Sequence, residues 1–161
     1  MSGVRILNGA SGSQLQLNAP VLPSWKSTPG CPAIFKPSPR WWTALRLIEG
    51  SHCVSGKEFG IELALREALG NAVVHGNQED PEKKVHLHCR CGPGEEISIV
   101  VTDQGKGFDL GKVVDDGFTS DSAAAHGHGI QLMKAYMDDV HFERGGSEVH
   151  MRKRSRSTSH S

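Results

Sequence analysis

One stretch near the middle of the chain constrains the fold most, because residues 55–77 have the pattern of a single amphipathic helix. Ser55 and Glu58 have the spacing of an N-terminal capping box, and Gly76 fits the position just past a helix end. Apolar residues at spacings of four, three and four form one stripe: Ile61, Leu65, Ala68 and Ala72. The sequence therefore predicts a helix that buries one face.

Two polar residues border this apolar stripe. Glu67 and Asn71 are four residues apart, so their side chains lie one above the other on a helix. At ~100° per residue, they lie roughly a quarter to a third of a turn from the stripe. A carboxylate and a carboxamide beside a core suit a site in which the first acts as a base and the second holds a metal ion. Taken alone, both residues are better explained as a solvated helix surface.

Two alternating segments follow this helix and predict a β-hairpin. Residues 84–91 alternate apolar or Cys residues with His and Arg, residues 97–102 continue the alternation, and Pro93-Gly94 marks the turn. Asp103 extends the apolar face of the second strand, so its carboxylate enters the apolar side at the strand end. A buried carboxylate needs a hydrogen-bonding partner, and a ligand with donor groups is one solution. The alternative is that Asp103 caps the following turn.

The remaining segments complete an α+β pattern. We expect a strand over 33–36, a helix over 39–49, a mobile lid over 116–126, a helix that opens at Gly127, and strands over 140–144 and 148–152. Strands joined by hairpins, with helices on one face, give a two-layer α+β sandwich.

Composition indicates one domain, residues 31–153, between two polar ends. Residues 1–30, rich in Gly, Ser, Asn and Pro, predict a flexible N-terminal arm with at most a short strand at Leu15 and Leu17, and residues 154–161 predict a disordered basic tail. Lys+Arg and Asp+Glu both number 18, which gives no argument for nucleic acid. Without an apolar run of membrane-spanning length or a signal core, we expect a cytoplasmic protein with no membrane contact and four reduced cysteines.

Three short motifs gain meaning from their order: residues 67–76, 103–107 and 127–129. Each alone is weak, because short glycine patterns arise by chance. On a helix, a strand end and a helix start, they together resemble the GHKL ATPase superfamily, in the form of its RsbW-like anti-sigma-factor serine/threonine kinases. The resemblance covers about residues 31–153. It implies the Bergerat ATP-binding fold, with a mixed, mostly antiparallel sheet and helices on one face.

The resemblance also implies a role for each motif. Glu67 would take the proton from a substrate serine, or from water, as it attacks the γ-phosphate of ATP. Asn71 would coordinate Mg²⁺, and Asp103 would accept a hydrogen bond from the adenine amino group. Gly105 and Gly107 would let the backbone approach the nucleotide, and N–H groups at the helix start would bind phosphates. The other residues of the implied nucleotide site are His75, Phe108, Gly127, His128, Gly129, Ile130 and Ser147.

Two positions differ from the usual pattern of this group. Ser147 follows Gly146 where the group usually has threonine, and serine keeps the hydroxyl. Some relatives have an arginine shortly before the second glycine motif, where this chain has residues 123–126, Ala-Ala-Ala-His. His126 or His128 is the alternative contact to the γ-phosphate.

The resemblance predicts a regulatory kinase that binds ATP and Mg²⁺ and phosphorylates a serine of an anti-sigma-factor antagonist of the STAS type. A sigma factor is a further implied partner, and the family allows a homodimer. The alternative is a nucleotide-gated protein-binding module with little or no phosphoryl transfer. A histidine-kinase fragment is disfavoured, because residues 1–54 are too short and too poorly helical for a phosphoacceptor helix pair. Zinc at His86 and His88 is disfavoured against a solvated strand face, because no third and fourth ligand converge on them.

Overall fold

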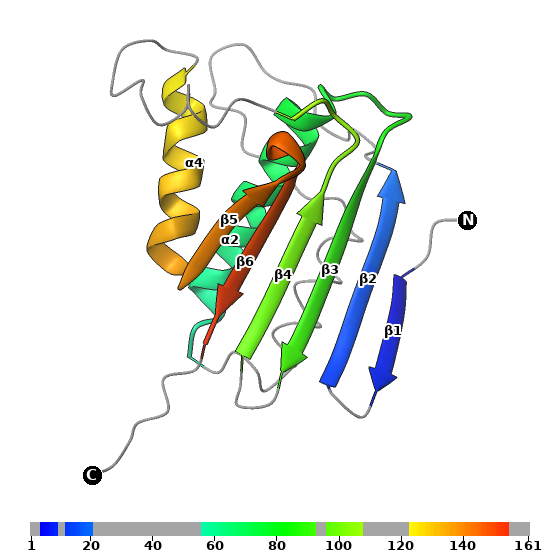
Figure 1. Ribbon diagram of the computed structural model, residues 1–161, viewed down its shortest axis with the longest axis vertical. Helices are drawn as coiled ribbons and strands as arrows, with labels where there is room; N and C mark the ends of the chain where they lie inside the picture. The colour runs from blue at the N-terminus through cyan, green and yellow to red at the C-terminus, as the bar shows by residue number, and fades with distance from the viewer. Residues whose placement is uncertain (1–3, 10–11, 21–55, 93–95, 108–122, 155–161) are drawn as a thin grey trace.

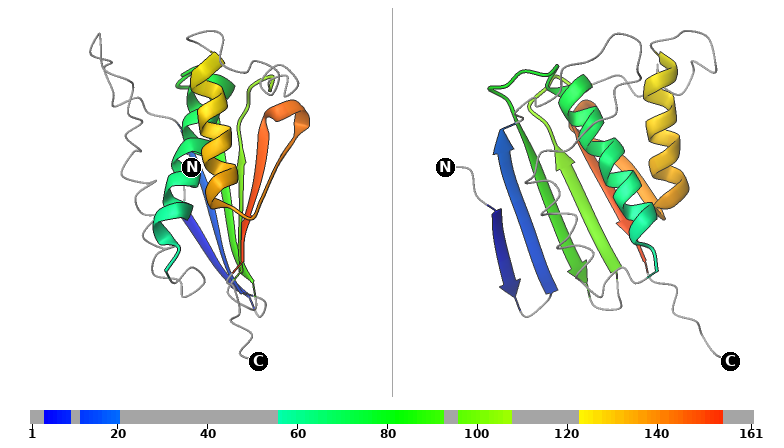
Figure 2. Two further views of the ribbon diagram at one scale, coloured as in Figure 1. Left: turned by 90° about the vertical axis from the view of Figure 1, so that its left-hand side faces the viewer. Right: turned by 180° about the vertical axis from the view of Figure 1, so that it is seen from behind.

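The computed structural model describes residues 4–9, 12–20, 56–92, 96–107 and 123–154. These residues form a six-stranded sheet with helices packed on one of its faces (Figures 1 and 2). The predicted two-layer α+β class is confirmed. The strand expected over 33–36, the helix over 39–49 and most of the lid lie outside the described residues. Neither described helix is long and apolar enough to cross a membrane.

The helical elements are α2 (Glu58–Gly70), which continues directly into the π-helical turn η2 (Asn71–Gly76), and α4 (Ala123–Tyr136). The strands are β1 (Val4–Gly9), β2 (Gly12–Pro20), β3 (Lys84–Gly92), β4 (Glu96–Thr102), β5 (Asp139–Glu143) and β6 (Glu148–Lys153), with the 3-10 turn η3 (Arg144–Gly146) between the last two.

The order of strands in the sheet is β1-β2-β3-β4-β6-β5. Every neighbouring pair of the described strands is antiparallel, where the family resemblance implied a mixed, mostly antiparallel sheet. The physical reason is the last crossover. The chain leaves β4, passes through α4 and returns as β5, and β6 then turns back and inserts between β4 and β5 (Figure 1). β4 and β5, which run in the same direction, are therefore not neighbours.

The N-terminal arm is a point at which the sequence prediction was wrong. Residues 4–9 and 12–20 are not a flexible arm but form the hairpin of β1 and β2 at the edge of the sheet. Leu15 pairs with Cys89 and Leu17 with Leu87, so the expected short strand exists and is longer than predicted. A polar sequence of this kind has little intrinsic strand signal, and the edge of β3, with its unpaired N–H and C=O groups, supplies the pairing.

The core lies between the sheet and the helix pair, as the periodicity predicted. The whole predicted stripe is buried: Ile61, Leu65 and Ala68 of α2 and Ala72 of η2. Alternate residues of the central strands pack against it: Val85, Leu87 and Cys89 of β3, Ile97, Ile99 and Val101 of β4, and Val149 and Met151 of β6. α4 adds Ile130, Met133 and Met137. The site residues that border this core are therefore held by well-packed elements.

Two local expectations fail. The N-cap of α2 is Lys57, which makes no side-chain capping bond, and Glu58 instead accepts a hydrogen bond from the N–H of Gly56 at 3.0 Å.

Cys91 is disulfide-bonded, whereas Cys89 is a free buried thiol whose pKa is raised to about 12 by burial. The expectation of four reduced cysteines was wrong because spacing along a sequence does not reveal which thiols the fold brings together.

Candidate functional site

A small cavity lies between α2, the end of β4 and the turn between β5 and β6, and three predicted site residues line it. Asn71, Asp103 and Ser147 reach its wall from three different elements. The rest of the wall is apolar or backbone: Ala68, Ala72, Gly76, Val101, Met133, Phe142, Gly146 and Val149. The cavity holds about 20 Å³, which is room for about one water molecule. Mostly apolar walls with a few polar groups are typical of a small-molecule site.

Asp103 extends the buried face of β4, as the alternation predicted. Its N–H donates to the carbonyl of Ser147 at 2.9 Å, and its Oδ1 accepts from the N–H of Gly105 at 2.7 Å. Burial raises the pKa of the Asp103 carboxyl, against the opposing effects of that N–H and of Lys83. The carboxylate also packs against Gly76, where an added Cβ would lie 2.3 Å from Oδ2. Asp103 is therefore a half-buried carboxylate fixed in orientation by its own loop.

Glu67 and Asn71 lie where α2 approaches α4 through Gly129. A Cβ on Gly129 would lie 2.9 Å from Oε2 of Glu67, and 3.6 and 3.7 Å from the amide atoms of Asn71. Both side chains are partly buried at the border of the core, as predicted. Asn71 is part of the cavity wall, and Glu67 lies next to the wall rather than in it. The structure thus brings the side chains of Glu67 and Asn71 together with Gly129 of the second glycine motif.

The loop after Asp103 packs tightly against two other turns. A Cβ on Gly105 would lie 2.0 Å from the carbonyl oxygen of Gly76, and one on Gly107 would lie 2.0 Å from that of Gly145. Gly107 also has a φ of 75°, which disfavours other residues. The family resemblance implied that these glycines let the backbone approach the nucleotide. In the structure, the close neighbours are backbone carbonyls of η2 and η3.

The second glycine motif lies inside α4 and not at its start. α4 begins at Ala123, so the expected helix start at Gly127 was wrong, and residues 123–126 belong to its first turn and not to a lid. Three alanines, the strongest helix formers, extend the helix by about one turn. The N–H groups from Gly127 onward consequently lie beyond the four free positions at the helix N-terminus.

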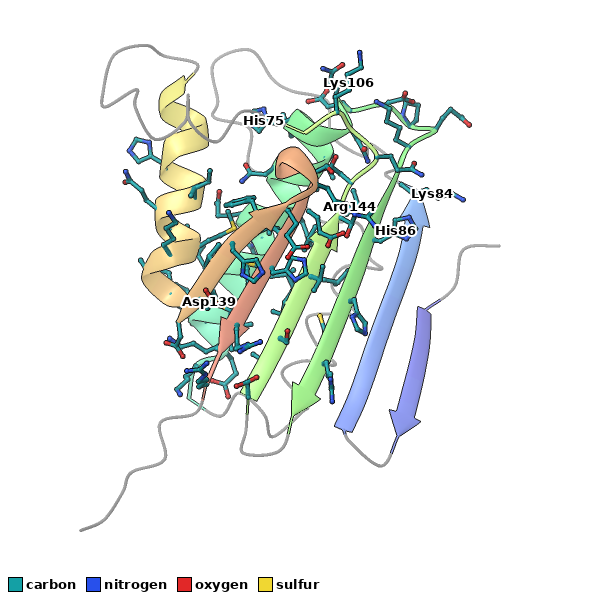
Figure 3. All side chains as sticks on the ribbon, viewed as in Figure 1. His75, Lys84, His86, Lys106, Asp139 and Arg144 are labelled. Carbon is teal, nitrogen blue, oxygen red and sulfur yellow. The ribbon has the colours of Figure 1, made fainter. Side chains whose placement is uncertain are left out.

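The remaining predicted residues are scattered. Ser147 is buried, and its Oγ donates to the carbonyl of Arg144 at 3.1 Å. Ile130 packs in the core, and His128 is exposed on α4. His75 lies on η2 (Figure 3), and neither histidine belongs to the cavity wall. Phe108 lies outside the described residues.

Asn77 is a site residue that the sequence did not reveal. It is fully buried, its Oδ1 accepts from the N–H of Gln104 at 2.9 Å, and its Nδ2 donates to the carbonyl of Lys84 at 3.1 Å. It therefore clamps the end of η2 to the start of β3 and to the residue after Asp103. The available signal was an Asn directly after the glycine at the helix end, which can bond neighbouring backbone groups.

Asn77→Ala is expected to lower the free energy of unfolding by about 2–4 kcal/mol, because two backbone groups lose their partner inside a packed loop. Urea unfolding measures the change. Glu82→Ala, an exposed position in the following turn, is the control and should cost less than about 0.5 kcal/mol. Equal losses in the two variants would contradict the role of Asn77 as a clamp.

This chain is similar in sequence to a known protein family and to several known proteins. Residues 40–153, which contain all three motifs, match the family model described as histidine kinase-like ATPase domain. The chain is 30% identical over 86 residues to the anti-sigma F factor of Heyndrickxia coagulans (52% of this chain, 58% of that protein). It is 33% identical over 101 residues to the anti-sigma F factor of Clostridium botulinum strain Eklund 17B / Type B (58% and 68%). It is 32% identical over 87 residues to the serine-protein kinase RsbW of Bacillus subtilis strain 168 (50% and 53%).

The matched regions span 58%, 68% and 53% of the length of these relatives. The family match, by contrast, covers most of this chain, from Arg40 to Lys153. It includes Glu67, Asn71, Asp103 and both glycine motifs. The chain therefore belongs to the histidine kinase-like ATPase domain family.

Proposed function

We propose that this chain is a regulatory serine/threonine protein kinase of the anti-sigma-factor type, which binds ATP with Mg²⁺ and transfers the γ-phosphate to a serine of an antagonist protein. The observation that carries the proposal is the meeting of Asn71, Asp103 and Ser147 at one cavity, with Glu67 beside Asn71. The names of the relatives support the same function, because two are anti-sigma F factors and one is a serine-protein kinase.

The adenine end of the proposed site is the cavity. The Asp103 carboxylate accepts a hydrogen bond from the adenine amino group, and the hydrogen bond that it accepts from the Gly105 N–H fixes its orientation. A partly desolvated carboxylate forms a stronger hydrogen bond than one in water. Because the cavity has room for about one water molecule, a purine requires its walls to open. Met133, whose unbranched side chain adapts its shape, is the wall residue best suited to move.

The phosphate end of the proposed site is the approach of α2 to α4. Mg²⁺ prefers oxygen ligands and is usually held by one or two protein groups together with substrate phosphates, and the carboxamide oxygen of Asn71 fits this requirement. When bound there, the ion neutralises charge on the phosphates. Gly129 keeps the backbone of α4 within reach of Glu67 and Asn71. Opening the first turn of α4, which holds the Ala run, would free the N–H groups of the glycine motif for phosphate binding.

Glu67 is the proposed base. Phosphoryl transfer depends mainly on positioning and charge stabilisation, so one carboxylate near the attacking hydroxyl suffices. In this role Glu67 accepts the proton of the substrate serine as its oxygen attacks the γ-phosphate.

A nucleotide-gated binding module is the second candidate. One observation favours it: the residues before Gly127 are Ala-Ala-Ala-His, with no arginine to stabilise charge on the transferring phosphate, and they are wound into α4. In that case ATP would change which partner binds, and no transfer would follow. Sigma factors and antagonist proteins remain the partners in both candidates.

The deciding experiment incubates the full chain with γ-labelled ATP, with and without Mg²⁺, and with STAS-type antagonist proteins. Mg²⁺-dependent label on a partner serine supports the kinase. Tight ATP binding with no label on any partner supports the binding module. Absence of ATP binding would overturn both.

Asp103→Asn is expected to weaken ATP binding about 100-fold, because the variant turns an amide against the adenine amino group and removes a charged acceptor worth about 2–3 kcal/mol. Isothermal titration calorimetry measures the loss. Unchanged affinity would remove Asp103 from the site.

The same variant should not unfold the protein. The folded-state pKa of Asp103 is raised by burial, so the ionised carboxylate destabilises the fold at neutral pH, and this cost disappears as the pH falls below that pKa. Without nucleotide at pH 7, the variant should melt at the same temperature as the wild type or higher, and the difference should shrink in acid.

A further inference from the structure

The last hairpin gathers imidazoles and carboxylates on the face of the sheet opposite the helices. His141 of β5 pairs in register with His150 of β6, and Glu143 pairs with Glu148. Their neighbours along each strand point into the core, so these four side chains point away from it. Figure 3 shows Asp139 at the start of this hairpin and Arg144 at its turn.

Three of these side chains converge. One potential ligand atom from each of His141, Glu143 and His150 lies within 4.8 Å of the other two. Glu143 bridges the rings: its Oε1 is 3.6 Å from Nε2 of His141, and its Oε2 is 3.6 Å from Nε2 of His150. The two rings are stacked, with centroids 4.7 Å apart and planes 13° apart.

We propose that His141, Glu143 and His150 form a binding site for a divalent transition-metal ion, with Zn²⁺ as its ion. Two imidazole nitrogens and one carboxylate are a common protein ligand set for zinc, with a further position open to water. Tetrahedral zinc with bonds of ~2.0–2.1 Å places its ligand atoms about 3.4 Å apart. One Glu143 oxygen is 3.6 Å from the His141 ring and the other is 3.6 Å from the His150 ring. One ligand atom from each residue lies within 4.8 Å of the other two, so small rotations bring the set to the tetrahedral spacing.

The surroundings of the cluster fit a metal site. Asp139 lies on the other side of the His141 ring, with Oδ2 3.7 Å from Nδ1, so Nε2 is left for the ion. A carboxylate at the second nitrogen of a histidine ligand is the usual way in which such a ring is oriented. Nε2 of His150 is hydrogen-bonded to Oε1 of Glu148 at 2.8 Å, so zinc would replace this bond and leave the Glu148 carboxylate beside the ion. The other oxygen of Glu148 accepts from Thr102 Oγ1 at 3.0 Å.

The ligands are also free to adjust. The side chains of His141 and Glu143 are 50% and 54% exposed, so small rotations bring the donor atoms together without disturbing the core. Their backbones are fixed by the β5–β6 register, which makes the site largely preformed. A solvated face with weak ion pairs is the alternative, and it predicts no stoichiometric metal binding.

The test titrates the full chain, without an affinity tag or nucleotide, with Zn²⁺ against a chromophoric chelator. We expect one Zn²⁺ per chain, retained in excess Mg²⁺ because imidazole ligands select transition metals. His141→Ala and His150→Ala should each weaken binding at least as much as the roughly 10–100-fold that loss of an outer-shell partner costs. Replacing Zn²⁺ by Co²⁺ reports the coordination geometry by visible absorption.

His86→Ala is the matched control, because it removes an exposed imidazole from the same face, on β3, outside the cluster. It should leave zinc affinity unchanged. Glu143→Gln, which keeps the side-chain shape, is the second ligand variant should either alanine variant fail to fold. The proposal is overturned if the wild type binds no stoichiometric Zn²⁺, or if binding persists at full affinity in the His141 and His150 variants.

Discussion

Glu67→Gln is expected to lower the transfer of the γ-phosphate to a partner serine by about 10²–10⁴-fold, the range for removal of a general base. Glutamine keeps the length of the side chain and its packing against Gly129, so ATP affinity should stay near the wild-type value. It cannot accept the serine proton, so only the chemical step is lost. Single-turnover transfer of labelled phosphate, measured beside an ATP titration, separates the two effects.

Glu62→Gln is the matched control on the same helix. Glu62 lies one turn before Arg66 and pairs with it at 2.6 Å, with its side chain 27% exposed, away from the cavity wall. A partly exposed i,i+4 pair contributes about 0.3–0.5 kcal/mol, so this variant should bind ATP and transfer phosphate as the wild type does. Full transfer by Glu67→Gln would show that another group takes the proton. Equal loss in both variants would point to a damaged helix.

The sequence predicted best those parts of the fold in which burial imposes a period. The stripe of α2 and the alternation of β3 and β4 name the buried residues directly, because each of those elements has one face on the core. The position of Asp103 follows from the same alternation by one further step. For this reason the carboxylate of the candidate site could be placed from the amino-acid pattern alone.

The sequence predicted least where the structure depends on contacts between segments that are far apart in the chain. Of the β1–β2 hairpin, the sequence indicated only a short strand at Leu15 and Leu17, because the hairpin depends on pairing with the edge of β3. Asn77 gains its role from Gln104, and the zinc cluster joins two strands whose register only the fold sets. His86 and His88, close in sequence, were the more visible candidates for zinc, yet the convergent set of potential ligands in the described residues is His141, Glu143 and His150.

The start of α4 shows a different limit. Propensity extends the helix to Ala123, whereas the family pattern places the phosphate-binding glycines at a helix start. The two are compatible if the first turn is marginal, because a single helical turn gains little stability from propensity alone. Nucleotide binding then takes N–H groups that the helix otherwise uses.

Gly107→Ala is expected to have a large effect on stability and to lower the free energy of unfolding by about 2–5 kcal/mol. An L side chain in the left-handed region costs about 1–2 kcal/mol, and Gly107 has a φ of 75°. A Cβ would in addition lie 2.0 Å from the carbonyl oxygen of Gly145, and overpacking of this kind adds about 1–3 kcal/mol. Chemical denaturation of the protein without nucleotide gives the value.

Two other glycines separate these causes. Gly145 has a similar φ of 65° but nothing within 4 Å of its added Cβ, so Gly145→Ala should show the backbone cost alone. Gly105 has no positive φ, but its Cβ would lie 2.0 Å from the carbonyl of Gly76, so Gly105→Ala should show the steric cost alone. If Gly107→Ala costs no more than Gly145→Ala, the loop after Asp103 is not wedged against η3. The cavity would then lose the contact that holds Asp103 and Ser147 in one geometry.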